Sequence, residues 1–493
     1  MNHSNRVRKV FFLSLLFLVA LFALFVVGDR IKNSRLVHFL WSAAGPHPPN
    51  IVLIVLDTLR ADHLSQYGYN LDTSPGLDRL SSSATIFEKA YSTSSWTVPA
   101  TASIHSGLHP QRHGTTQDGD TLNTAISTIA EQLKLAGYET AGFSDNLHIS
   151  RKTDFDQGFD TFFDFGGKDA LAYPDISRMM TRVKSWVERH ENAKRPFFLY
   201  MHPMNCHGPY RVPKAAQKTL LSRRPSRRFK YYGSVMADIM FRGKTKRRKE
   251  VSKKYLESLF EQYDTAVRYS TDQLGRFLSF LSKKGFDDDT MVILTADHGE
   301  ELFDHGGFSH GYSLFDEVVR VPLVIRLPRQ RQAHRVKNVV SVMDIYPTII
   351  DIVDNRTNTA TDGHSLLPFF KGINNSVWID TGGGEKLFRN RSLVLALNWE
   401  RRGIIRGWVN PHYKYLNVEK DYSGRRSKKL LFELSRDPHE KKSVAKQNRK
   451  KMRHIERTLE KRWEAYVTER YGPSTNRLKE MNVEALKALG YIQ

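Results

Sequence analysis

Cysteine is almost absent from this sequence of 493 residues. The single cysteine, Cys206, excludes disulfide bonds within the chain and excludes a zinc module built from cysteines alone. Glycine and proline are also modest, at 31 and 19 residues, which excludes collagen-like and low-complexity chains. Hydrophobic residues make up 40% of the sequence, so the chain can bury a sizeable core and we expect it to be mainly globular.

Acidic residues are scarce relative to basic ones. The chain has 52 Asp and Glu against 75 Lys and Arg, and its formal net charge is +23. A charge of this sign favours anionic partners, which are nucleic acid, an anionic lipid or glycolipid surface, or an acidic substrate.

One long apolar run stands near the beginning of the sequence. Residues 10–27 read VFFLSLLFLVALFALFVV, and a basic segment at 6–9 precedes them. A helix of this length spans about 27 Å at 1.5 Å per residue, close to the hydrocarbon thickness of a bilayer. We therefore expect a transmembrane signal anchor at 10–28 behind a cytoplasmic tail at 1–9. A cleaved signal peptide and a buried core helix are the alternatives.

The anchor decides the expected compartment. A short tail before a large soluble domain favours the tail inside and the bulk of the chain outside, in the periplasm or the extracellular space. The membrane, through this single-pass anchor and an anionic lipid or glycan surface, is then the expected partner, and nucleic acid is not. Residues 29–49 form the expected linker. The sequence leaves the oligomeric state open.

Four short apolar runs have the composition of buried parallel strands. Helical patterns alternate with them, which predicts an α/β fold with a large, mostly parallel sheet between helices. In such a sheet, ligands bind at the carboxyl ends of the strands. The expected strands are 50–57, 195–201, 290–296 and 321–326, and the expected helices are 126–136, 178–190 and 254–284.

Two further regions depart from this alternation. Beyond about residue 380, short strands near 392–397, 404–408, 413–417 and 429–434 predict a smaller antiparallel C-terminal subdomain with a basic tail, at 381–493. The other region is a basic insertion at 211–254, whose part 223–254 holds thirteen Lys and Arg and two acids. Three interpretations of the insertion stay open: a solvated segment, a membrane-surface patch, or a nucleic-acid site.

Polar residues follow two of the expected strands directly. Asp57 ends the first strand, and Asp297 and His298 end the third. Two carboxylates and one imidazole form a mixed oxygen and nitrogen donor set, which suits a divalent cation such as Zn²⁺ or Mn²⁺ better than Ca²⁺ or Mg²⁺. Any one of these residues alone is weak evidence for a metal site, because an Asp at a strand end is often the N-cap of the following helix.

A series of short blocks extends the pattern along the chain. They lie at 57–63, 74–80, 97–107, 110–114, 202–210, 295–301, 309–317, 343–348, 362–366, 437–440 and 489–491. In these blocks the chain resembles the sulfatase branch of the alkaline phosphatase superfamily. The resemblance implies an alkaline-phosphatase-like fold, a sulfatase-like catalytic domain at 50–380, and a sulfatase-like hydrolase or phosphoryl-group transferase that acts on a sulfate or phosphate ester.

The nucleophile motif departs from the sulfatase pattern. Sulfatases oxidise the Cys or Ser of a Cys/Ser-x-Pro-x-Arg motif to formylglycine, whereas this chain has Thr-Val-Pro-Ala-Thr at 97–101. Thr97 replaces the convertible residue and Thr101 replaces the arginine. Cys206 lies outside the motif and does not take its place. In these respects the chain is similar to the threonine-nucleophile members, which are phosphoethanolamine and phosphoglycerol transferases and phosphodiesterases.

The resemblance assigns roles to the matching residues. Asp57, Thr97, Asp297 and His298 would hold a divalent metal ion, which would lower the pKa of the Thr97 hydroxyl so that it attacks phosphorus. Thr97 also has a purely structural interpretation, as the residue before a helix that starts near Pro99.

Two histidines complete the implied catalytic set. His207 and His310 match family histidines that contact the non-bridging oxygens and protonate the leaving group. Candidates for a second metal are His202, Asp304 and His305.

Three functions remain as hypotheses. The first is a membrane-anchored, metal-dependent enzyme that cleaves or transfers a phosphate-type ester, such as a phosphodiester, a phosphonate, or a phosphoglycerol or phosphoethanolamine group, through Thr97. The second is a sulfuric ester hydrolase that works without formylglycine. The third is an inactive anchored binding protein, which Thr101 and Asn205 would favour because they replace charged residues of relatives.

Overall fold

The computed structural model describes residues 48–164, 175–190, 195–220, 253–354, 360–370, 384–399, 403–421 and 427–471. The described residues from 49 onwards form one compact unit. The expected tail, anchor and nearly all of the linker lie outside the described residues, as does most of the basic insertion. Within the described ranges, no helix is long and apolar enough to cross a membrane.

The centre of the molecule is an eight-stranded sheet in the order β10-β2-β9-β6-β1-β5-β3-β4. Strand β1 (Asn50–Val55) lies in the middle, parallel to β5 (Phe197–His202) on one side and to β6 (Thr290–Thr295) on the other. Every residue of β5 and β6, and all of β1 except Asn50, is buried. Such uniformly apolar strands form because helices cover both faces of the sheet.

One strand runs against the others. Strand β9 (Arg320–Arg326) pairs antiparallel with both β6 and β2 (Thr85–Tyr91). The chain reaches β9 through a short hairpin and the single turn of α11 (Asp316–Val319) instead of a crossover helix, so it returns in the opposite direction. The sheet is therefore mixed and mostly parallel. The four strands that the sequence analysis did not identify are β2, β3 (Glu139–Ser144), β4 (Thr161–Phe163) and β10 (His334–Ser341).

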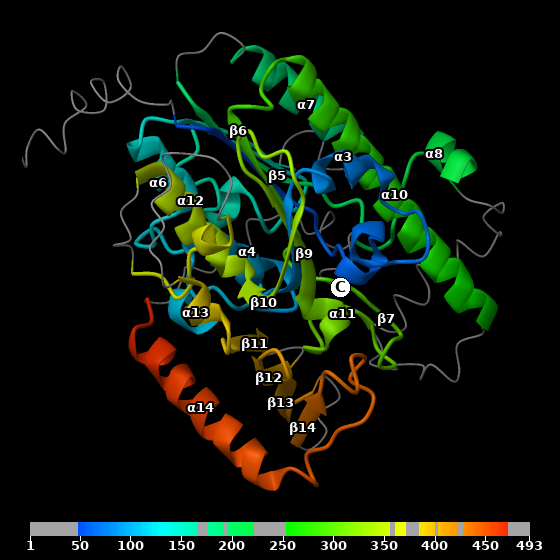
Figure 1. Cartoon of the computed structure of the whole chain (residues 1–493), viewed down its shortest axis with the longest axis vertical. Helices are drawn as coiled ribbons and strands as arrows, with labels where there is room; N and C mark the ends of the chain where they lie inside the picture. Colours follow the sequence, from blue (N-terminus) through cyan, green and yellow to red (C-terminus); the bar gives the residue numbers. More distant parts are fainter. Residues whose placement is uncertain are drawn as a thin grey trace, which may run out of the picture. The chain divides into compact units, whose positions relative to one another are not determined.

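Two groups of helices flank this sheet (Figure 1). One group contains α4 (Thr97–Ser106), α6 (Ile129–Leu135) and α12 (Ile345–Asp354), which contact one another. The other contains α7 (Ile176–Glu188) and the 31-residue helix α10 (Lys253–Lys283), which also touch. Helix α6 starts at a capping box in which the Thr128 hydroxyl and the Glu131 carboxylate bond each other's backbone amides.

A second, four-stranded antiparallel sheet follows near the end of the chain. Its strands stand in sequence order, as β11 (Leu393–Trp399), β12 (Gly403–Val409), β13 (Tyr413–Lys420) and β14 (Lys428–Glu433). Helix α14 (Arg449–Thr468) buries Ile455 and Leu459 against one face of this sheet, among Trp408 and Tyr415. The fold is thus α/β and alkaline-phosphatase-like, with the antiparallel C-terminal sheet that the sequence predicts. The domain boundary expected at 380 falls outside the described residues and stays a prediction.

The smaller sheet also contacts the segment that leads into α4. Trp399 of β11 stacks on Trp96 with ring centroids 4.1 Å apart. The backbone amide of Ala396 donates to the carbonyl of Thr93 at 2.8 Å. Both contacts fix the backbone immediately before Thr97, so the C-terminal sheet takes part in positioning that residue.

Candidate active site

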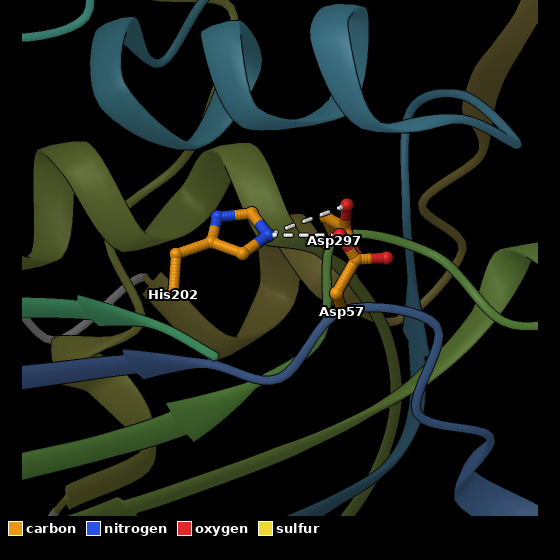
Figure 2. Close-up of side chains that lie close together, drawn as sticks. All are labelled: Asp57, His202 and Asp297. Atoms are coloured by element: carbon orange, nitrogen blue, oxygen red, sulfur yellow. Dashed lines mark ion pairs between the residues drawn. The ribbon is translucent and has the colours of Figure 1, made fainter. Parts of the chain in front are cut away.

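Three neighbouring strands bring three polar side chains to one edge of the main sheet. Asp57 follows β1, His202 is the last residue of β5, and Asp297 follows β6. Because β6, β1 and β5 are adjacent and parallel, their carboxyl ends meet. Figure 2 shows the imidazole of His202 pointing at both carboxylates.

The three side chains are close enough to share one ligand. The Nε2 atom of His202 lies 3.4 Å from Asp57 Oδ2 and 3.8 Å from Asp297 Oδ2. One donor atom from each of the three residues falls within 4.8 Å of the other two. All three side chains have no solvent exposure, so the group is a closed set of two carboxylate oxygens and an imidazole nitrogen.

His298 extends this group towards Thr97. Its Nε2 lies 3.4 Å from Asp297 Oδ2 and 3.3 Å from the Thr97 hydroxyl. The other ring nitrogen, Nδ1, is 2.9 Å from the carbonyl oxygen of Gly299. A carbonyl accepts and never donates, so Nδ1 carries the proton, and the lone pair of neutral His298 is on Nε2, facing the carboxylates and the hydroxyl.

Thr97 is the first residue of helix α4, directly after the extended N-cap residue Trp96. All ten residues of this helix are buried. The first amides of a helix have no partners within the helix and attract anions. The start of α4 is therefore suited to the negatively charged oxygens of a tetrahedral group next to the Thr97 hydroxyl.

Histidines 310 and 207 lie next in line. The ring centroid of His310 is 4.5 Å from that of His298 and 5.0 Å from that of His207. Both are nearly fully buried, at 4% and 3% exposure. The six residues that the resemblance proposes for the site, which are Asp57, Thr97, His207, Asp297, His298 and His310, thus come together at the carboxyl edge of the sheet.

The two carboxylates influence each other strongly. Burial alone would raise the pKa of Asp57, but the nearby imidazole of His202 and the charges of His207 and His298 lower it well below its usual range. Burial and the charge of Asp57 raise the pKa of Asp297. One carboxylate is therefore held ionised at the expense of the other, which is the expected behaviour of two acids that share a site.

The donor atoms fit a metal ion. Among the residues that the structure describes, Asp57 Oδ1, Asp297 Oδ2 and His202 Nε2 are buried without a hydrogen-bond partner. Buried polar atoms normally have partners, and a divalent cation would satisfy all three at once. Asp57, His202 and Asp297 therefore form a buried group that is able to hold a metal ion.

The sequence analysis underestimated three residues of this site. It proposed His202 only for a second metal, whereas the ring lies between Asp57 and Asp297. It did not identify Asn146, whose Nδ2 donates to Asp57 Oδ2 at 2.6 Å, or Glu300, whose Oε1 is 2.9 Å from His310 Nδ1. The position of Asn146 just after β3 is a usable signal, because β3 is the next strand beyond β5.

The other two candidates for a second metal have different partners. Asp304 forms an ion pair with Arg60 at 2.7 Å, and His305 pairs with Glu317 at 2.6 Å. Both line a small cavity of about 50 Å³ with Arg60 and Glu317, and His202 is not part of its lining. The grouping of His202 with Asp304 and His305 around a second ion therefore has no geometric basis in the described residues.

Cys206 supplies no nucleophile to the site, and Thr101 supplies no positive charge. Cys206 is fully buried, and burial raises the pKa of its thiol to about 12, so it is not a nucleophile at neutral pH. Thr101 is buried in α4, four residues and about one helical turn after Thr97. A threonine there carries no charge, so this position provides no cation to the tetrahedral group.

Comparisons with known proteins agree with this geometry. The family model described as "Sulfatase" matches residues 49–355, and the chain therefore belongs to the sulfatase family. A second model, "N-sulphoglucosamine sulphohydrolase, C-terminal", matches residues 304–469. The protein is a sulfatase-like hydrolase of the alkaline phosphatase superfamily that acts on ester substrates.

Individual relatives are distant. An arylsulfatase of Clostridium perfringens is 25% identical over 80% of this chain and 89% of its own length. The multifunctional alkaline phosphatase superfamily protein PehA of Trinickia caryophylli is 24% identical over 80% of this chain and 91% of its own length. Among solved structures, the phosphonate monoester hydrolase of Agrobacterium radiobacter matches with a TM-score of 0.64 at 19% identity, covering 84% of this chain and 96% of that one.

Proposed function

We propose that this protein is a metal-dependent enzyme that cleaves a phosphodiester or phosphonate ester through a covalent intermediate on Thr97, with water or an alcohol as the final acceptor. One observation carries the proposal. The Thr97 hydroxyl lies at the buried start of α4, 3.3 Å from His298 Nε2, where the resemblance to sulfatases would put the nucleophile.

The chemistry of threonine supports a phosphate-type substrate. The carbon that bears its hydroxyl also bears a methyl group, so oxidation would give a ketone and never the aldehyde of formylglycine. Thr97 therefore acts as a plain alcohol. Once esterified, it is released only by a second attack on the central phosphorus or sulfur atom, which is the ordinary course of phosphoryl transfer through a hydroxyl nucleophile.

The residues of the site divide the reaction between them. Asp57, His202, Asp297 and His298 would hold a divalent ion, with Zn²⁺ or Mn²⁺ suiting their oxygen and nitrogen donors. Such an ion, when bound, lowers the pKa of the hydroxyl beside it and neutralises charge on the phosphoryl oxygens.

The bonds change in two stages. In the first, Thr97 Oγ1 loses its proton to solvent and bonds to phosphorus, the bond from phosphorus to the leaving oxygen breaks, and His310 gives that oxygen a proton. In the second, water attacks phosphorus, the bond to Oγ1 breaks, and Oγ1 regains a proton while the attacking water loses one to His310. His207, beside His310, would contact a non-bridging oxygen throughout.

A sulfuric ester hydrolase remains the second candidate. The family model and several relatives carry sulfatase names, and one solved structure of the same fold is titled as BT4656 with its substrate D-glucosamine-2-N,6-O-disulfate. The phosphonate monoester hydrolase and PehA are matched equally well. The nature of the nucleophile therefore decides between the candidates.

The test is mass spectrometry of the metal-loaded protein after brief exposure to a phosphodiester and, separately, to an aryl sulfate. We expect a phosphoryl-type adduct on the peptide that contains Thr97 and none in Thr97→Ala. A sulfate adduct on the same peptide would replace the proposal with the second candidate. Absence of both adducts and of bound metal would leave the inactive binding protein.

The location is part of the proposal. The apolar run at 10–27 supports a single-pass anchor with the catalytic domain outside the cytoplasm. Protease added to cells whose outer membrane, where there is one, has been opened should digest the catalytic domain, and membranes washed at high salt should retain the full-length protein. Release of the protein by salt alone would contradict the anchor.

A further inference from the structure

A short hairpin sets two buried ionisable side chains opposite each other. Strands β7 (Glu301–Leu302) and β8 (Phe308–Ser309) pair antiparallel, with Glu301 opposite Ser309 and Leu302 opposite Phe308. In an antiparallel pair the opposing positions advance in opposite directions along the chain. The next pair towards the open end of this hairpin is therefore Glu300 with His310.

The hairpin turn is closed tightly enough to hold this register. The carboxylate of Glu301 accepts hydrogen bonds from the backbone amides of His305 and Gly307, at 3.1 and 2.7 Å. A Cβ atom at Gly307 would lie 2.7 Å from that carboxylate, so a larger residue there would displace the Glu301 side chain. Gly306 has a φ angle of +88°, which glycine adopts without strain.

Glu300 and His310 are directly hydrogen-bonded. Glu300 Oε1 lies 2.9 Å from His310 Nδ1, and the two side chains are 2% and 5% exposed. The backbone of Glu300 is fixed as well, because its carbonyl accepts a hydrogen bond from Arg60 Nη1 at 3.0 Å. The carboxylate is thus aimed at one ring nitrogen from a backbone that a buried guanidinium holds in place.

The His310 ring also lies close to the reacting groups. Its ring lies 4.5 Å from the ring of His298, whose Nε2 contacts the Thr97 hydroxyl. A carboxylate that accepts the Nδ1 proton leaves Nε2 as the nitrogen for proton transfer.

We propose that Glu300 is the positioning residue of His310, and that its side chain holds the imidazole in the orientation needed to protonate the leaving oxygen. The inference rests on the proposed function for the role of His310. Glu300 touches no substrate atom in this arrangement. In the step itself, the proton on His310 Nε2 passes to the leaving oxygen as the bond from phosphorus to that oxygen breaks, and Nδ1 keeps its proton and its bond to Glu300.

The experiment compares a poor and a good leaving group. Full-length protein loaded with Zn²⁺ or Mn²⁺ is assayed with ethyl and 4-nitrophenyl esters of phenylphosphonate. The ethyl ester needs protonation of its leaving oxygen and the nitrophenyl ester does not. We expect Glu300→Gln, which keeps the side-chain volume but removes the charge, to lower kcat for the ethyl ester by about 30-fold and for the nitrophenyl ester by less than about 3-fold.

Two controls separate positioning from a structural role. Glu301→Gln changes the neighbouring buried glutamate, which bonds the hairpin turn and not His310, and it should keep the wild-type ratio between the two esters. A double variant, Glu300→Gln with His310→Ala, should be no slower on the ethyl ester than His310→Ala alone, because Glu300 acts only through His310. Metal content and thermal unfolding of each variant show that it is folded and loaded.

The outcomes are distinct. Equal slowing of both esters by Glu300→Gln, or an additive loss in the double variant, would overturn the role of Glu300. If the wild type cleaves neither phosphonate ester but cleaves aryl sulfates, the proposed substrate class fails. The same comparison, made with 4-nitrophenyl and phenyl sulfate, then still tests Glu300.

Discussion

Two regions of the molecule bury charge in opposite ways. Where the C-terminal sheet meets the main domain, the ammonium group of Lys414 is fully buried, 2.7 Å from Asp316 and 2.9 Å from Glu440. At the carboxyl edge of the main sheet, Asp57 and Asp297 are equally buried, with only histidines as ionisable partners within ion-pair distance among the described residues.

The first region pairs a buried cation with two acids. Burial would lower the pKa of Lys414, but Asp316 and Glu440 raise it above its usual value, so the ammonium stays charged. Asp344 shows the same arrangement elsewhere: Arg391 donates to both of its oxygens, and the amides of Ser341 and His364 donate to it as well.

The second region is incomplete. One oxygen of Asp57 and one of Asp297 are buried without a hydrogen-bond partner in the part of the chain that the structure describes. A protein that needed these acids only for packing would pair them as it pairs Asp344. The contrast is that these two oxygens lack partners where a cation would bind, whereas Asp344 and Lys414 are paired.

The sharpest test of this contrast is at Thr97. We expect Thr97→Ala to lower kcat by at least about 10⁴-fold, because removal of a nucleophile abolishes the covalent route. Thr97→Ser keeps the hydroxyl and should retain measurable turnover. Steady-state kinetics with a phosphonate ester provide the measurement. Equal activity of the alanine and wild-type proteins would remove Thr97 from the reaction.

Substitutions around Lys414 should change the stability of the protein and not its activity. Lys414→Met leaves two buried acids without their cation, and we expect the free energy of unfolding to fall by about 3–5 kcal/mol. Denaturant unfolding measures this change. Adding Glu440→Gln to Lys414→Met should recover part of the loss, and a double variant less stable than the single one would contradict the ion-pair explanation.

Metal binding should offset the free-energy cost of burying Asp57 and Asp297 together. A saturating divalent ion, at about 100 times its Kd, should stabilise the wild type by about 2.7 kcal/mol, and Asp297→Asn should gain little. When a chelator removes the metal, the order of stability of the two proteins should be reversed. Burial and the charge of Asp57 raise the pKa of Asp297, so its ionised form costs folding free energy at neutral pH, and the asparagine variant should be more stable by about 1 kcal/mol. Thermal unfolding with and without chelator would show the crossing, and a less stable variant in chelator would count against it.

Glu301 is an intermediate case, because backbone amides rather than a cation bind its carboxylate. Burial and the charge of Glu317 raise its pKa to about 7. An acid with a raised pKa in the folded state contributes stability below its unfolded pKa, near 4.5, and loses this contribution as pH rises towards 7. Relative to wild type, Glu301→Gln should therefore gain about 2 kcal/mol between pH 4.5 and 7.5. A difference that does not change with pH would show that the backbone bonds already balance the charge.

Much of the fold follows from local patterns. The apolar runs predicted β1, β5 and β6 and the four strands of the C-terminal sheet. Buried strands have continuous apolar sequences, and half-buried strands alternate apolar and polar residues. Helices α6, α7 and α10 also match their expected ranges within a few residues. Strands β3 and β4 were not predicted, because their sequences, ETAGFS and TFF, are too polar or too short to be recognised as apolar runs. The antiparallel direction of β9 was not predicted either, because it depends on the segment that leads into β9 and not on the residues of the strand itself.

The sequence by itself indicated the sulfatase family and the positions of Asp57, Asp297 and His298 at strand ends. Tertiary structure alone decided which side chains meet. His202 joins Asp57 and Asp297 because β5 and β6 both lie beside β1, although the two strands are far from it along the chain. Glu300 meets His310 because the hairpin register sets them opposite each other. Strand order and register are long-range properties, and no local pattern of residues encodes them.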